Sequence, residues 1–284
     1  MLPDGRRAAP GWGRCLAPVV AQTQQGDVYC LTLQAPEVAR SATPGQFVNL
    51  LAMPGGFTGF DPLLRRPLSI ARLRREQGEI TVIYRALGRG TRLLAQAVPG
   101  QRLDLLGPLG LSFPDPARGA GTLALVGGGL GIPPMIAAAE WAQAAGRPAV
   151  ALVGARSADL LAGADLLRET GVSLTITTDD GSAGERALVT APLAAALTGE
   201  TITSGPPAGG RVDEIWACGP EPMLRAVKAL AAQHGVPCYL SLERYMACGF
   251  GVCIGCTVPR AGSPGYLKCC VDGPVLPAGE VDLG

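Results

Sequence analysis

Five cysteines near the end of the 284-residue chain have a spacing that could hold an inorganic group. Cys248, Cys253 and Cys256 are separated by four and by two residues, and Cys269 and Cys270 follow within KCCVDGP. Cysteine thiolates bind zinc ions and iron–sulfur clusters, and pairs of thiols form disulfides. The segment therefore presents three alternatives, and each implies a different class of protein.

The spacing favours an iron–sulfur cluster of the [2Fe–2S] type. Structural zinc sites usually draw their ligands from two separate C-x2-C pairs, and this segment offers one. A C-x4-C-x2-C run with a more distant fourth cysteine is typical of plant-type [2Fe–2S] ferredoxins. Glycines within the run, at positions 249, 251 and 255, would let the chain wrap closely around a cluster. The spacing alone leaves Cys269 and Cys270 as alternative fourth ligands.

The elements that position these cysteines begin with a β-rich region from about residue 18 to residue 106. Short β-prone runs are separated by turn residues, and no long helical period interrupts them. This pattern predicts a small antiparallel β-barrel. The runs are APVVAQTQ, VYCLTLQA, GQFVNLLA, RPLSIARL, EITVIYRA and QRLDLL.

From about residue 121, apolar strands alternate with helical segments. Near-continuous apolar strands of this kind indicate βαβ units around a parallel sheet that helices cover on both faces. The strands are TLALVG, AVALVGA, SLTITT, EIWACG and CYLSLE, and the helices are PPMIAAAEWAQAAG, DLLAGADLLRET and EPMLRAVKALAAQHG. Residues 203–211, TSGPPAGGR, are expected to form a loop within this region.

The expected fold is therefore an α+β chain of several domains. We expect a loose N-terminal tail over residues 1–14 and an antiparallel β-barrel over 15–118. A central α/β domain with a parallel sheet follows over 119–242, and a small cysteine-rich segment occupies 243–284. This last segment is too short and too irregular to build its own core, so it needs a metal centre or a host surface.

A glycine-rich turn in the central domain could hold a pyrophosphate. LVGGGLGIPPM lies between a predicted strand and a predicted helix, where free N–H groups and the helix dipole favour phosphate. It departs from the strict dinucleotide fingerprint, because no Asp or Glu ends the next strand, and a simple tight turn is the alternative interpretation. Two more glycine loops at strand ends, 177–184 and 217–223, favour one shared ligand crevice.

A second candidate site lies in the barrel region, in RRPLSI and IYRALGRGT. An arginine can pair with a phosphate, and Ser69 offers a hydroxyl at a sheet edge. Taken alone, the stretch is equally typical of an ordinary strand and turn.

The order of these motifs along the chain resembles the ferredoxin reductase-like flavoprotein family, over about residues 15–240. In that family the barrel binds the flavin of FAD and the second domain binds a nicotinamide nucleotide. The resemblance implies FAD contacts at Arg66, Pro67, Leu68, Ser69, Ile83, Tyr84, Arg85, Gly90 and Thr91. It implies nucleotide contacts at Gly127, Gly128, Gly129, Gly131, Asp180, Gly181, Cys218, Gly219 and Pro220.

The cysteine segment carries a narrower resemblance. ERYMACGFGVCIGC and the KCCVDGP tail, together with RRPLSI, are similar to the electron transfer subunits of NAD-linked bacterial dihydroorotate dehydrogenases. In that family the ligand cysteine lies two positions before Asp-Gly-Pro, which selects Cys270 over Cys269. The implied cluster ligands are Cys248, Cys253, Cys256 and Cys270.

This resemblance also implies a function and a partner. A separate FMN-containing catalytic subunit would oxidise dihydroorotate to orotate, and electrons would pass through the [2Fe–2S] cluster and FAD to NAD. The expected assembly is a heterotetramer of two plus two subunits. The sequence leaves no segment for a substrate domain, so we assign no catalytic residue to this chain. Alternatives are a reductase subunit of a hydrogenase, sulfite reductase or transhydrogenase complex, or a redox-sensing module.

Composition excludes several other classes. A formal net charge of +1 offers no basic footprint for nucleic acid. No apolar stretch reads as a membrane span or a secretory signal, so a cytoplasmic location is expected. The single histidine, His234, gives little support to a histidine-dependent hydrolase. Whether the nucleotide is NAD or NADP is weakly determined, because Arg156 and Ser157 could accept a 2′-phosphate.

Overall fold

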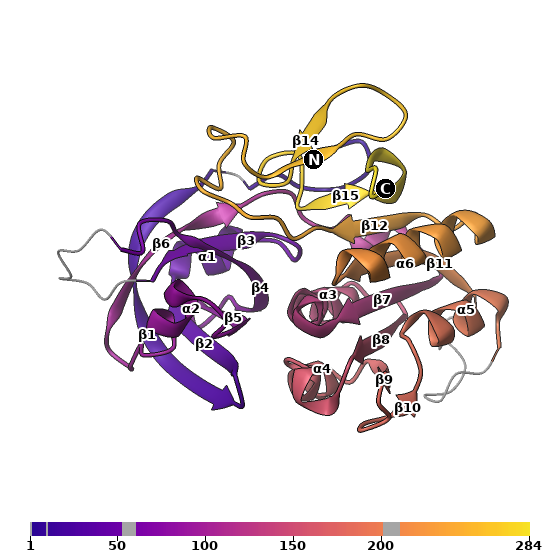
Figure 1. Ribbon diagram of the computed structural model, residues 1–284, viewed down its shortest axis with the longest axis horizontal. Helices are drawn as coiled ribbons and strands as arrows, with labels where there is room; N and C mark the ends of the chain where they lie inside the picture. Colours follow the sequence, from indigo (N-terminus) through magenta and orange to yellow (C-terminus); the bar gives the residue numbers. More distant parts are fainter. Residues whose placement is uncertain (1, 10, 53–60, 201–210) are drawn as a thin grey trace.

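The computed structural model describes residues 2–9, 11–52, 61–200 and 211–284, so most of the expected loop at 203–211 lies outside the described residues. A β-barrel lies beside a helix-covered sheet, and the cysteine segment lies across both of them (Figure 1). The expected class, an antiparallel barrel followed by a parallel-sheet domain, is confirmed.

The barrel closes from six antiparallel strands in the order β1-β2-β5-β4-β3-β6. Each predicted run forms one strand. The strands are β1 (Gly13–Gln25), β2 (Val28–Gln34), β3 (Phe47–Leu51), β4 (Arg66–Arg74), β5 (Glu79–Arg85) and β6 (Arg102–Leu109). Two short helices that the sequence did not indicate, α1 (Pro36–Ser41) and α2 (Arg89–Leu94), connect them.

The second domain is a seven-stranded sheet in the order β10-β9-β8-β7-β11-β12-β15. All neighbours are parallel except β12 and β15, which are antiparallel. The strands are β7 (Thr122–Gly128), β8 (Ala149–Ala155), β9 (Ser173–Thr178), β10 (Glu185–Arg186), β11 (Val212–Cys218), β12 (Cys238–Ser241) and β15 (Val275–Pro277). The helices are α3 (Ile132–Ala144), α4 (Ala164–Glu169), α5 (Thr190–Thr198) and α6 (Glu221–His234).

Alternation along the central strand β7 divides the core between the two faces of the sheet. Leu123 and Leu125 pack on the face that holds α3 and the barrel residue Ile83. Ala124 and Val126 pack on the opposite face with residues of α5, α6 and the cysteine segment. In Figure 1, α3 and α4 accordingly lie between the sheet and the barrel. The barrel and the cysteine segment thus pack against this domain from different sides.

Two helices differ from the sequence-based expectation. The helix expected over 159–170 is reduced to α4, because Gly163 adopts φ +82° and interrupts it. Helix α5 was not predicted, since it is short and has no side-chain cap at its start. Burial of Leu193 and Leu197 against the sheet stabilises α5, and this tertiary contribution leaves little trace in local propensity.

The cysteine segment uses a host surface. Its strand β15 pairs with β12, so the segment completes the edge of the sheet. Cys256, Cys269 and Cys270 are buried in the same core as Leu224 of α6. A small hairpin of β13 (Thr257–Pro259) and β14 (Tyr266–Lys268) projects from this base.

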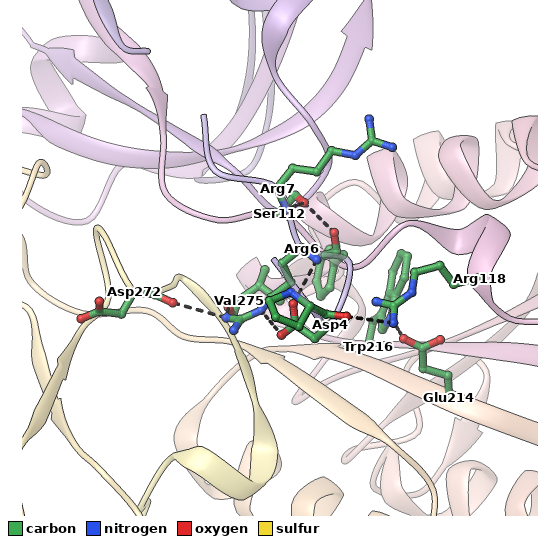
Figure 2. Close-up of polar contacts among 11 residues, drawn as sticks. Asp4, Arg6, Arg7, Ser112, Arg118, Glu214, Trp216, Asp272 and Val275 are labelled. Carbon is green, nitrogen blue, oxygen red and sulfur yellow. Dashed lines mark hydrogen bonds and ion pairs between the residues drawn. The ribbon is translucent and has the colours of Figure 1, made fainter. Parts of the chain in front are cut away.

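The N-terminal residues do not form the loose tail that the sequence suggested. The Arg6 side chain is buried, and Nη1 donates hydrogen bonds to the carbonyls of Val275 at 2.6 Å and Asp272 at 3.3 Å. Asp4 pairs with Arg6 at 2.6 Å, and the Arg7 amide donates to the Ser112 hydroxyl at 2.9 Å. Figure 2 shows this segment running between the cysteine segment and the chain that links the two domains. We call residues 2–9 the N-terminal strap.

None of the helices in the described ranges is long and apolar enough to span a membrane.

The strap yields a stability prediction with an adjacent control. Arg6→Gln removes a buried cation that holds two carbonyls, so we expect destabilisation by about 2–3 kcal/mol. Arg7→Gln removes an arginine that pairs with Asp115 and is 43% exposed, so we expect a loss below about 1 kcal/mol. Thermal unfolding of the purified full chain, with hydrogen exchange followed over residues 268–275, measures both. Equal behaviour of the two variants would contradict a specific role for Arg6.

Candidate functional site

The glycine loops of the central domain open onto one cleft of about 510 Å³. It lies at the carboxyl ends of the parallel strands, where ligands bind in open α/β sheets. Five residues predicted for the nucleotide line this cleft: Gly128, Gly129, Gly131, Gly219 and Pro220. The loops after β7 and β11 therefore meet as the sequence suggested.

Close backbone packing explains why a glycine stands at position 131. A Cβ atom there would come within 2.0 Å of the Cys218 carbonyl oxygen. Gly131 thus allows the start of α3 to approach the end of β11. This approach brings the two loops to the same wall of the cleft.

The other predicted nucleotide residues lie behind or beside the cleft. Gly127 packs against Ile132, and Cys218 is buried, which raises the pKa of its thiol. The Asp180 carboxylate accepts hydrogen bonds from Ser182, at 2.9 Å from the amide and 2.6 Å from the hydroxyl. Neither Asp180 nor Gly181 is among the residues that line the cleft.

Several lining residues were missed by sequence reasoning. Asp179 follows β9 and Glu243 follows β12, so the strand-end rule could have found them. Arg156, which the sequence offered as a possible 2′-phosphate contact, also lines the cleft. Leu188 is a further lining residue, but no predicted strand ends next to it, so nothing in the sequence selected it. Arg85 reaches the cleft from the barrel, so both domains form its walls.

Glu243 is the acidic side chain at the cysteine-segment end of the cleft. Glu243 is an exposed residue, but partial desolvation at the wall of the cleft raises the pKa of its carboxyl group. A proton on this carboxylate is therefore held more tightly than on an ordinary glutamate.

On the barrel, two of the elements predicted to bind the flavin, β4 and α2, meet at Arg66 and Gly90. The Arg66 guanidinium lies so close to Gly90 that a Cβ there would be 2.2 Å from it. Thr91 caps α2, with its hydroxyl accepting from the Gly88 amide at 3.0 Å. Strand β4 pairs with β5 only from Ile70 onward and pairs with β3 before that point. The Arg66–Ser69 motif therefore lies where the barrel opens between β4 and β5.

The three β5 residues do not share one environment. Ile83 packs toward the second domain, where a Cβ at Gly163 would be 2.7 Å from it. Arg85 forms hydrogen bonds to Asp27 at 2.9 and 3.0 Å beside the cleft. Tyr84 points into the barrel, stacks on Tyr29 at 5.5 Å and donates to Gln22 at 2.9 Å. Only the backbone of Tyr84 remains on the side that Arg85 occupies.

The cysteine loops approach one another over a short region, with different exposure. Cys253 is exposed, Cys248 is partly buried, and Cys256 and Cys270 are buried. The Cys253 amide lies 3.4 Å from the Cys248 sulfur, and the Gly255 amide lies 3.5 Å from the Cys253 sulfur. N–H groups directed at sulfur stabilise thiolates and cluster sulfurs.

Two of these thiols have opposite acidities. Burial raises the pKa of Cys248, but backbone N–H groups led by that of Cys253 outweigh it and lower the pKa to about 6. Burial and the adjacent Cys256 thiol raise the pKa of Cys270 to about 12, although a hydrogen bond from the Gly251 amide acts in the opposite direction. Cys270 therefore lies next to Cys256 and within reach of the first loop.

Cys269 is fully buried, and its amide donates to the Cys256 carbonyl at 3.0 Å. The chain itself does not bring all the thiols into a ready-made metal site. Within the described parts of the chain, no three His, Cys, Asp or Glu side chains already converge as metal ligands. Cys256 and Cys270 are adjacent and buried, whereas Cys253 is exposed.

Comparison with known proteins decides the family. The model of the iron–sulfur cluster binding domain of dihydroorotate dehydrogenase B matches residues 243–282. An electron transfer subunit of dihydroorotate dehydrogenase B (NAD+) from Geobacillus thermodenitrificans is 41% identical, over 95% of this chain and 99% of its own. The corresponding subunit of Lysinibacillus sphaericus is 36% identical, over 93% and 97%. The chain belongs to this family of electron transfer subunits.

Solved structures of other redox proteins share the fold of this chain. A chain from the NADH-dependent reduced ferredoxin–NADP oxidoreductase superposes with a TM-score of 0.78 and 31% identity, covering 95% of this chain and 91% of its own. A ferredoxin reductase of carbazole 1,9a-dioxygenase, at 22% identity and a TM-score of 0.62, shares the fold.

The Gly131 contact gives a prediction for nucleotide binding. Gly131→Ala forces the β11 loop away from α3, so we expect NADH binding to weaken at least tenfold and stability to fall by about 1–3 kcal/mol. Gly279→Ala is the control, because its Cβ would meet open space. Titration with NADH compares the two variants, and equal affinities would exclude the proposed packing constraint.

Proposed function

We propose that this chain is the electron transfer subunit of an NAD-linked dihydroorotate dehydrogenase. A partner subunit with FMN oxidises dihydroorotate, and the net reaction is dihydroorotate + NAD+ → orotate + NADH + H+. The observation that supports this most directly is the convergence of three sites. Arg85 of the barrel lines the nucleotide cleft. Asn49 of the barrel contacts the first cysteine loop, where its Nδ2 donates a hydrogen bond to the Cys248 carbonyl at 3.0 Å.

FAD exchanges hydride with nicotinamide and single electrons with an iron–sulfur centre, which is the chemistry these groups supply when bound. The chain's own residues bind and orient them. Arg66 would pair with the FAD phosphates, and the opening between β4 and β5 would admit the flavin. The same proposal covers the motif as a whole: Arg66, Pro67, Leu68, Ser69, Ile83, Tyr84, Arg85, Gly90 and Thr91.

For the cluster, we assign Cys248, Cys253, Cys256 and Cys270 as ligands. The low pKa of Cys248 supports this assignment, because thiolates bind iron. Cys270 is favoured over Cys269 by its position next to Cys256 and the Gly251 amide. The thiols that are still apart would be drawn together by the metal, as in other small domains that fold around one.

The cleft fits NAD in the orientation that the glycine turn dictates. Gly128, Gly129 and Gly131 would approach the pyrophosphate, and Gly219 and Pro220 would face the nicotinamide half. Asp180 and Gly181 would border the adenosine ribose, with Asp179 nearer to it, while Gly127 and Cys218 act through packing.

Apolar side chains around the cysteine loops suit a protein partner. Val252, Ile254 and Tyr245 are 76%, 65% and 97% exposed. Trp12 stacks on Phe250 at 5.1 Å and extends the same surface. We assign this surface to the catalytic subunit, in a heterotetramer of two plus two subunits. Nine cysteines without a disulfide fit a reducing compartment, and we place the complex in the cytoplasm.

The proposal predicts the contents and the activity of the purified protein. One FAD and two irons per chain are expected, with flavin and cluster absorbance in the visible spectrum. Mixed with the FMN-containing partner, the protein should form NADH when dihydroorotate is added. A colourless chain with one zinc ion, or a pair that reduces neither flavin nor NAD+, would contradict it.

The choice of NAD over NADP generates a separate prediction. Asp179 and Arg156 line the cleft together, and the Ser157 hydroxyl donates to Asp159 at 2.5 Å, so it is not free for a 2′-phosphate. Asp179→Asn removes a carboxylate that repels this phosphate, so the ratio of kcat/KM for NADP+ to that for NAD+ should rise about tenfold. Asp165→Asn is the control, because Asp165 pairs with Arg168 on α4 and does not line the cleft. An unchanged ratio in Asp179→Asn would disprove the assignment.

A further inference from the structure

Asn49 is a fully buried polar residue on the outer face of the barrel. Its neighbours in β3, Val48 and Leu50, point into the barrel core, so alternation directs Asn49 outward. Phe47, two residues earlier, shares this outward face and packs in the core that contains the cysteine segment. The barrel face that carries Asn49 is therefore covered.

One half of the Asn49 amide holds the cysteine segment. Nδ2 donates to the Cys248 carbonyl at 3.0 Å. Gly249 adopts φ +84°, and a Cβ on it would come within 2.3 Å of the same nitrogen. The first cysteine loop thus rests directly on this side chain, and the bond to the carbonyl fixes which end of the amide is the donor.

The other half of the amide has no partner. Oδ1 is buried, and no donor in the described part of the chain reaches it. An acceptor left in this state costs about 1–3 kcal/mol, and buried polar atoms are nearly always hydrogen-bonded. Turning the amide over would set an oxygen against the Cys248 carbonyl. The described residues therefore leave Oδ1 open to a donor from a bound group.

The cross-strand neighbour of Asn49 indicates where that donor comes from. Asn49 pairs with Pro67 of β4, and Phe47 pairs with Ser69, so these side chains share the outward face. Pro67 has no N–H to offer. The Arg66–Ser69 motif is also where the proposed FAD would bind, at the opening beyond Ile70.

We propose that Asn49 is a positioning residue between the two redox groups, with Nδ2 holding the cluster loop and Oδ1 accepting a hydrogen bond from an N–H or O–H of the flavin. This inference rests on the proposed function, because it requires FAD in the barrel. A single rigid amide then fixes the flavin relative to Cys248, and the separation between them stays constant.

The test compares Asn49→Leu with Gln46→Leu in the holoprotein. Gln46 is a fully buried amide at the start of β3 whose groups are all satisfied, with Oε1 accepting from Thr43 at 2.9 Å and Nε2 donating to Gly110 at 3.0 Å. Asn49→Leu should raise the FAD dissociation constant about tenfold, the effect of one lost hydrogen bond. Gln46→Leu should reduce thermal stability but leave FAD affinity within about twofold.

Two further readouts separate positioning from folding. The thermal shift caused by adding FAD should shrink in Asn49→Leu, and the cluster's electron paramagnetic resonance signal should change because the Cys248 loop loses its donor. Flavin resonance Raman bands that respond to N–H bonding distinguish a ring N–H donor from a ribityl hydroxyl. If Asn49→Leu fails to fold, Asn49→Ala, which removes the same acceptor with a smaller side chain, should raise the FAD dissociation constant by a similar factor.

Wild-type FAD affinity and an unchanged cluster signal in Asn49→Leu would overturn the inference. The same holds if Gln46→Leu weakens FAD as strongly, since the effect would then be general loss of packing. Wild-type protein that binds no FAD would instead disprove the proposed function, and that result is seen before any variant is made.

Discussion

The structure depends on the burial of a segment that cannot fold alone. The cysteine loops have no core of their own, and the apolar side of Cys256, Cys269 and Cys270 is covered by α6 and by the sheet. Because β15 joins β12 through backbone hydrogen bonds, this burial has a fixed register. The position of Cys256 and Cys270 is thus inherited from the nucleotide domain, whereas the Cys248 loop rests on Asn49 of the barrel. A shift of the sheet edge would move Cys256 and Cys270 relative to the barrel.

The alternation of β7 explains how three sites come to share one small region. One face of the sheet is used for α3 and the barrel, and the other for α5, α6 and the cysteine segment. The elements that pack on the two faces meet at the carboxyl edge of the sheet. Arg85 of the barrel and Glu243 at the start of the cysteine segment line the same cleft there. The proposed flavin, nucleotide and cluster sites therefore lie near one another because of how the elements pack on the two faces of the sheet.

Much of this architecture could be predicted, because it rests on periodicity and spacing. The six barrel strands and the central parallel strands follow the two-residue alternation or the continuous apolar runs that their burial requires. The cysteine spacing located the cluster segment, which the family model then matched. The roles of Arg6 and Asn49 could not be predicted, because each depends on a partner about 200 or more residues away. Asp179 could have been found from its place after β9, whereas Leu188 could not.

The bond between Arg6 and the Val275 carbonyl also constrains when the molecule can be completed. The two residues are 269 positions apart, so the strap cannot close until almost the whole chain has been synthesised. Contacts of such long range form late and slowly. The strap must therefore stay undocked until the loop that carries Val275 has been made. Arg6 would therefore dock only after all four proposed ligand cysteines, which precede Val275 in the chain, have been made.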